Sequence, residues 1–302
     1  MRESIRGFSD AVVEDCSSAD RLSGLADEME GVSRLVADNP ALRLVLADPG
    51  LAAHVRRSVV TDLFASQVSD ACVRLLVFVI DADRATEFTQ NLAWLTRFVA
   101  AARDGMHPVH DGPLGRTAAT ERADGYASAV LEAVTADDGL GDVEDDLFRF
   151  SRVVLGSDEL TEALTDIRTP LEARRGVVND LLSSKVTGAS TRLAVYAVLV
   201  SRPRDYISVL SALVERVAEE SQRQVAEVRA ATEMTDEQQR RLGAALTRIL
   251  GHDVDVRVIV DRSVLGGFVA SVGDSVVDGS VRHRLEQLRD RLVLPGANVN
   301  TR

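Results

Sequence analysis

The chain has 302 residues, a formal net charge of −12 and only 4% aromatic side chains. A chain of this length predicts two or three domains, each large enough to bury a core, here built mainly from Leu, Val and Ala. The negative charge disfavours nucleic acid and anionic membrane surfaces as main partners, because both attract cationic proteins.

Neither a leader nor a membrane span is expected. No apolar run follows Met1, and no segment approaches the roughly 18 uninterrupted apolar residues of a transmembrane helix. Any contact with a membrane is therefore expected to be indirect, through a partner. Cys16 and Cys72 lie far apart without a C-x-x-C motif, which predicts buried free thiols rather than a redox or metal site.

An internal repeat organises the first two thirds of the chain. A shift of 118 positions aligns residues 7–92 with residues 125–210 without a gap. Hydrophobic residues recur with the helical period of 3.6 throughout both copies, and no strand pattern competes. The repeat predicts a duplicated helical bundle, with a first bundle at residues 1–103 and a second at residues 118–222. Matched positions include Gly7 with Gly125, Phe8 with Tyr126, Arg56 with Arg174, and Arg74 with Arg192.

The second copy shows the helix boundaries more clearly. Thr169-Pro170-Leu171-Glu172 reads as a capping box with Pro at the first helical position, whereas the first copy has a weaker start at Asp48-Pro49. Residues 189–200 are apolar on most sides, which predicts a central helix of the bundle. Pro203 then interrupts the pattern, and a long helix is expected over residues 206–223.

Residues 104–117 form a linker by composition, rich in Gly, Pro and His. His107 and His110 could serve as metal ligands. Because neither Cys nor carboxylates stand nearby at ligand spacing, a solvated linker is the better interpretation. His54, His252 and His283 have no identifiable catalytic partners.

The last segment, residues 223–293, predicts a β-α-β-β-α unit followed by a tail at 294–302. Residues 224–232 suggest a short strand, and Thr235-Asp236-Glu237-Gln238 is a capping box. It opens a helix whose apolar residues Leu242, Leu246, Ile249 and Leu250 share one face, with Gly251 as the stop. Val256, Val258 and Val260 then alternate with polar residues, as in a half-buried strand.

A string of motifs closes this unit. Gly266-Gly267 permits a bend or close approach before a strand, and Gly273-Asp274 lies between two apolar runs as a hairpin turn. Ser280 caps a final helix, and Asp278 stands before it, where the helix dipole favours negative charge.

The order and spacing of these motifs resemble the C-terminal signature of the delta subunit of F-type ATP synthases, the oligomycin-sensitivity-conferring protein family. The matching residues are Gly266, Gly267, Gly273, Asp274, Asp278, Gly279, Ser280, Arg284 and Leu285. The competing interpretation is a generic hairpin and helix in another small α+β unit. Residues from about 118 to 293 fit the family plan, and Tyr126-Ala127-Ser128-Ala129 matches its Tyr-Ala-x-Ala start. Residues 1–115 are then an extra bundle, as in actinobacterial relatives.

The predicted fold is therefore mainly α with a small α+β C-terminal domain, comprising two tandem helical bundles of about six helices each and the β-α-β-β-α unit. The resemblance implies a non-catalytic stator subunit on the cytoplasmic face of the plasma membrane, held there peripherally. Its implied partners are the alpha subunits, whose N-terminal helices the bundle receives, and a b-type subunit of the peripheral stalk.

The same resemblance implies a groove for an alpha-subunit helix between the first and fifth helices of the second bundle. The residues expected there are Tyr126, Ala129, Val130, Leu193 and Tyr196. Ordinary bundle core is the competing interpretation for each of them. The first bundle could add a second groove, for another alpha terminus or for the stalk.

No motif suggests catalysis. The chain lacks a phosphate-binding G-x-x-x-x-G-K-[ST], a G-x-S-x-G elbow and an H-E-x-x-H zinc motif. Gly266-Gly267 precedes a strand rather than a helix, so it does not suit a phosphate-binding turn. We expect no catalytic residues, cofactor or metal. A free helical adaptor or regulatory module that borrowed a similar C-terminal unit is the alternative function, and neighbouring genes would distinguish the two.

Overall fold

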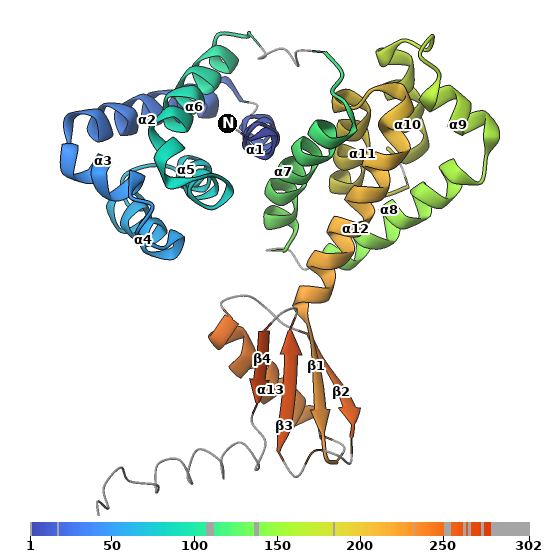
Figure 1. The fold of residues 1–302 in the computed structure, drawn as a ribbon. Helices are drawn as coiled ribbons and strands as arrows, with labels where there is room; N and C mark the ends of the chain where they lie inside the picture. The colour runs from blue at the N-terminus through green and yellow to red at the C-terminus, as the bar shows by residue number, and fades with distance from the viewer. Residues whose placement is uncertain are drawn as a thin grey trace, which may run out of the picture. The chain divides into compact units, whose positions relative to one another are not determined.

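The fold is mainly α, with a small α+β unit at the C-terminal end, as predicted (Figure 1). Contacts divide the chain into two units, Met1–Val217 and Ala218–Arg302, and the first unit holds both bundles except the end of the second bundle's last helix. The finer boundaries predicted at residues 103, 117 and 222 remain predictions. The computed structural model describes residues 2–16, 18–106, 112–135, 139–183, 185–232, 234–250, 255–261, 264, 267–272 and 275–278.

Within the described residues, each bundle contains six α-helices and one 3₁₀ turn. The first comprises α1 (Glu3–Asp15), α2 (Ala19–Asp38), α3 (Pro40–Ala47), α4 (Ala53–Phe64), α5 (Asp70–Ala82), η1 (Ala85–Glu87) and α6 (Phe88–Arg103). The second comprises α7 (Arg116–Thr135), α8 (Leu140–Leu155), α9 (Asp158–Thr165), α10 (Leu171–Leu182), α11 (Gly188–Val200), η2 (Pro203–Asp205) and α12 (Tyr206–Gln224).

The sequence repeat is a structural duplication. After the shift of 118 positions, the bounds of α3, α4 and α5 coincide residue for residue with those of α9, α10 and α11. The N-cap residues of α5 and α11 explain why these helices begin at equivalent positions. Ser69 accepts a hydrogen bond from the backbone N–H of Cys72, and the equivalent Thr187 accepts one from the N–H of Ser190. A capping side chain at the same position therefore starts the same helix in both copies.

The capping box predicted at Thr169–Glu172 is wrong. Helix α10 begins at Leu171, and its N-cap, Pro170, makes no side-chain capping hydrogen bond. Pro170 is extended, with ψ at 149°, so Thr169 lies one residue too far from the helix to cap it. Asp166 instead closes the preceding turn, where its side chain accepts the N–H of Arg168 at 2.9 Å.

The two bundles meet where α1 packs against α7 (Figure 1). The two helices approach each other closely at Gly7 and Gly125. A Cβ on Gly7 would lie 1.8 Å from the carbonyl oxygen of Arg122, and one on Gly125 would lie 1.9 Å from that of Ser4. Any larger side chain would overlap the facing backbone. Gly7 and Gly125 are repeat equivalents, as are Ser4 and Arg122, so the contact is reciprocal.

The second unit is a mixed sheet with a helix. It contains β1 (Val225–Ala230), α13 (Asp236–Leu250), β2 (Asp255–Val260), β3 (Phe268–Val272) and β4 (Ser275–Asp278). The strand order is β2-β1-β3-β4, with β1 parallel to β2 and the other pairs antiparallel. Its described core contains Val228, Leu242, Leu246 and Ala270. The predicted elements from β1 to β4 are thus confirmed, while the final helix falls outside the described residues.

The capping box at the start of α13 is confirmed. The backbone N–H of Gln238 donates to Thr235 Oγ1 at 3.3 Å, and the N–H of Thr235 donates to Gln238 Oε1 at 2.9 Å. These reciprocal bonds satisfy two N–H groups at the helix start that would otherwise have no partner.

Replacing Gly7 with Ala is expected to destabilise the first unit by about 2 kcal/mol or more, because the new Cβ overlaps a backbone carbonyl that cannot rotate away. Gly31→Ala is the control, since a Cβ there meets nothing within 4 Å and Ala favours the helix by about 0.5–1 kcal/mol. Urea denaturation measures both. Equal stability of the two variants would contradict the close contact.

The caps give a second prediction. Thr187→Ala is expected to lower the free energy of unfolding by about 1 kcal/mol, because it removes the bond to the N–H of Ser190. Thr169→Ala should change it by less than about 0.5 kcal/mol, since Thr169 makes no capping bond. Urea denaturation compares the free energy of unfolding of the two variants. A larger loss of stability for Thr169→Ala than for Thr187→Ala would contradict the structure and support a capping role for Thr169.

Candidate helix-binding groove

Reciprocal ion pairs join the two bundles beside the glycine contact. Arg74 Nε lies 2.9 Å from Glu132 Oε2, and Arg192 Nε lies 3.3 Å from Glu14 Oε1. Arg74 is equivalent to Arg192 and Glu14 to Glu132, so the same contact is made twice with the roles of the bundles exchanged. This is the arrangement of a two-fold symmetric dimer interface, here built within one chain.

Stacked aromatic rings repeat in the same way. Phe8 and Phe78 stack with ring centroids 4.0 Å apart in the first bundle, and the equivalent Tyr126 and Tyr196 stack at 3.7 Å in the second. Arg74 lies over the ring of Phe8 and Arg192 over that of Tyr126, at 5.6 and 5.7 Å. Each ring pair therefore ties the first helix of a bundle to its fifth helix, α5 or α11.

The hydroxyl groups of the second pair break this symmetry. Tyr126 donates a hydrogen bond to the carboxylate of Glu14, and Tyr196 donates one to that of Asp10. Both acceptors lie on α1, so these bonds join the bundles, whereas Phe8 and Phe78 have no group that could do so. Burial raises the pKa of both phenols, and the carboxylates Glu14 and Asp10 raise it further, although Arg192 opposes this at Tyr126.

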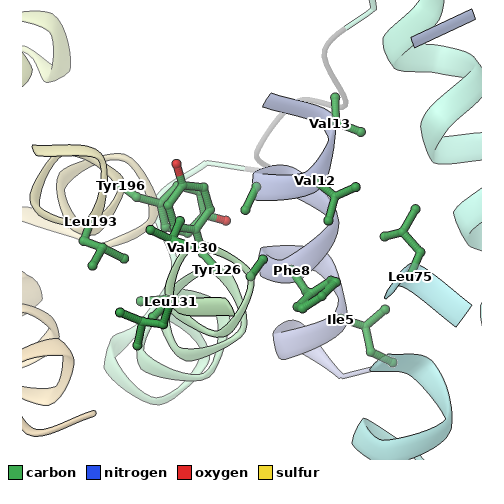
Figure 2. Close-up of a cluster of buried hydrophobic side chains, with 14 of the residues drawn as sticks. Ile5, Phe8, Val12, Val13, Leu75, Tyr126, Val130, Leu131, Leu193 and Tyr196 are labelled. Carbon is green, nitrogen blue, oxygen red and sulfur yellow. The ribbon is translucent and has the colours of Figure 1, made fainter. Parts of the chain in front are cut away.

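The five residues expected to form the groove come together, and all are buried. Tyr126, Ala129 and Val130 lie on α7, and Leu193 and Tyr196 lie on α11, each at most 4% exposed. Figure 2 shows the two tyrosine rings stacked between these helices, with α1 on the other side of α7. That they receive a partner helix stays a prediction, since each also serves as core.

The tyrosine pair lines an open groove of about 1050 Å³. Tyr126 and Tyr196 are the two expected residues that line it. Its apolar lining comes from both bundles: Val13, Leu22, Phe98 and Ala102 from the first, and Leu171, Val195 and Leu199 from the second. Charged lining residues are Asp10, Glu14, Arg103, Arg175 and Arg192.

Sequence reasoning missed the contribution of the first bundle. The repeat predicts two equivalent bundles but not the face on which they meet. One signal was present: Gly7 and Gly125 occupy equivalent positions in helices, where glycine is unfavourable unless another backbone comes close.

The signature residues of the second unit are only partly described. Gly267 has φ of 78°, the left-handed region that favours glycine, and Asp278 ends β4 opposite Val269. The β3–β4 register pairs Val272 with Ser275 across the predicted two-residue turn. Gly266, Gly273, Asp274, Gly279, Ser280, Arg284 and Leu285 lie outside the described residues.

Cys16 and Cys72 are buried free thiols, as predicted, and burial raises the pKa of Cys72 to about 12, so it remains protonated at neutral pH. Across the described ranges, no group of three or more His, Cys, Asp or Glu residues could hold a metal ion. His107, His110, His252 and His283 are not among these residues. No helix in the described part of the chain has the length and apolar character needed to cross a bilayer.

Comparison with known proteins gives a consistent family match. The family model of the ATP synthase delta (OSCP) subunit matches residues 6–107 and 123–292. A curated "ATP synthase subunit delta" from Salinispora arenicola is 34% identical over 271 residues, covering 90% of this chain and 89% of the relative. Those of Thermobifida fusca and Streptomyces avermitilis are 34% and 32% identical and cover 93% and 92% of this chain, and 94% and 91% of their own lengths.

Among solved structures, a chain of the Toxoplasma gondii mitochondrial ATP synthase hexamer matches 58% of this chain and 98% of its own length. The sequence identity is 19% and the TM-score 0.31.

The tyrosine pair predicts a pH dependence. Unfolded tyrosines ionise near pH 10, while the folded pair stays protonated, so above about pH 10 the unfolded state binds fewer protons and stability falls. The double variant Tyr126→Phe/Tyr196→Phe should be less stable at pH 8, by about 1–3 kcal/mol per lost bond to a carboxylate, and should lose less on going to pH 10.5. Urea denaturation at both pH values tests this, and parallel losses would contradict it.

Proposed function

The chain belongs to the ATP synthase delta (OSCP) subunit family, whose members are non-catalytic stator components of that complex, and we propose that it links the catalytic head to the peripheral stalk. The family match carries this proposal, because it extends over both bundles and the C-terminal unit. A free adaptor that had borrowed only the C-terminal unit would not match over residues 6–107 and 123–292, so that alternative is not favoured.

The head contact is assigned to the first unit. Rotary synthesis requires that the head stay still while the rotor turns inside it, so the link must resist torque. An amphipathic helix laid in an apolar groove between helices provides a contact of this kind. The groove above Tyr126 and Tyr196 has the required apolar lining, and in this proposal it receives the N-terminal helix of an alpha subunit.

The stalk contact is assigned to the second unit, which would bind a b-type subunit. Ile259 and Val260 support this assignment, because they are 40% and 48% exposed on β2, the outermost strand at one edge of the described sheet. Exposed apolar residues at a strand edge are typical of surfaces that pair with another chain.

The location follows from these partners. We place the chain at the cytoplasmic face of the plasma membrane, held peripherally through the complex. Family membership supports peripheral association with the complex, and the cytoplasmic face is part of this proposal.

Calorimetric titration of the purified chain with a peptide of the alpha-subunit N-terminus tests the head contact. A load-bearing link predicts a Kd of about 1 nM or tighter, equivalent to about −12 kcal/mol. A scrambled peptide of the same composition is the control, because it keeps charge and hydrophobicity but loses the amphipathic face. Absence of saturable binding by a chain that circular dichroism shows to be folded would contradict the assignment.

A further inference from the structure

The groove has one wall from each bundle. Val13, Leu22 and Phe98 come from α1, α2 and α6, while Val195 and Leu199 come from α11 on the opposite side. Its volume of about 1050 Å³ lies at the upper end of the roughly 300–1,000 Å³ of small-molecule pockets, and it is open to solvent. A mainly apolar lining between helices suits the apolar face of another helix.

Two apolar lining residues of the groove, Phe98 and Leu199, have charged repeat equivalents on the other side of the interface. Phe98 corresponds to Arg216, which pairs with Asp124 at 3.0 Å. Leu199 corresponds to Asp81, which pairs with Arg57 at 3.4 Å. Burying these pairs beneath an apolar helix face would remove their solvation without replacing it. The two sides of the duplicated unit are therefore not equivalent as binding surfaces.

Two arginines lie at the rim of the apolar groove. Arg103 on α6 and Arg175 on α10 stand on opposite walls, 37% and 47% exposed. Arg103 forms ion pairs with Asp104 and Asp27, and Arg175 forms one with Glu172. These are surface ion pairs that contribute little and can exchange. The carboxylates inside the groove, Asp10 and Glu14, already accept hydrogen bonds from the tyrosine hydroxyls. A partner that complements this surface is therefore an apolar helix flanked by acidic residues.

We propose that the first bundle is the second wall of one composite groove, and that each chain binds a single amphipathic helix with acidic flanks there. The inference rests on the proposed function, which supplies the alpha-subunit N-terminal helix as the occupant. It assigns the extra bundle a role in that same contact instead of an independent groove of its own.

Fluorescence anisotropy with a labelled alpha-subunit N-terminal peptide and the full chain tests the proposal. Ala102→Glu places a carboxylate on the first-bundle wall, and Ala19→Trp fills the groove from an exposed position at the start of α2, where folding is little affected. Both should weaken binding about tenfold or more, the loss expected for a buried interface position.

The second wall supplies a matched pair of variants. Val195→Glu should also weaken binding by about tenfold or more. Val77→Glu changes the repeat-equivalent residue, which is likewise half-buried on α5, and should leave the affinity within about twofold. Calorimetry of the unaltered chain should give one peptide per chain.

Three outcomes overturn the proposal. If Ala102→Glu and Ala19→Trp bind like the unaltered chain while Val195→Glu does not, the first bundle is no wall, and the proposed function stands. Two peptides per chain, with Val77→Glu removing one of them, would show independent grooves. No binding by the unaltered chain would overturn the proposed head contact together with this inference.

Discussion

The close contact between α1 and α7 is the constraint on which the first unit depends. Gly7 and Gly125 let two helix backbones meet where a single Cβ would come within 2 Å of a carbonyl oxygen. Around this point the chain repeats the ion pairs of a symmetric dimer interface, and each bundle contains the same stacked pair of rings. Because both partners belong to one chain, association costs far less entropy than between free subunits, and the two bundles form a single unit.

Duplication also allowed the two sides of this interface to diverge. Phe8 and Phe78 are purely apolar, while Tyr126 and Tyr196 carry hydroxyls that donate hydrogen bonds to carboxylates of the other bundle. Beyond the rings, Phe98 and Leu199 line the groove on one side, while their equivalents Arg216 and Asp81 form ion pairs on the other. A symmetric pair would present like residues on both sides, whereas the described residues of the two sides differ at these positions. That difference agrees with the proposal that the chain binds a single helix in the groove.

Features with a local cause were predictable from sequence. The 3.6-residue hydrophobic period predicted the helices. The capping box at Thr235 predicted the start of α13, because its two hydrogen bonds form between residues three positions apart. The box at Thr169 failed, since extended Pro170 moved the helix start beyond its reach. The contribution of Phe98 and Val13 to the groove was not predictable, because it depends on how two bundles meet, which no local pattern encodes.

The claim that α1 and α7 couple the bundles can be tested through Trp94, the one tryptophan of the chain, which lies on α6 of the first bundle. Leu193→Ala removes buried contacts in the second bundle and should cost about 2–5 kcal/mol. If the bundles unfold together, Leu193→Ala should lower the urea concentration at the midpoint of the Trp94 fluorescence transition. The midpoint measured by circular dichroism should fall by the same amount. An unchanged Trp94 transition beside a shifted, separate one would contradict the coupling.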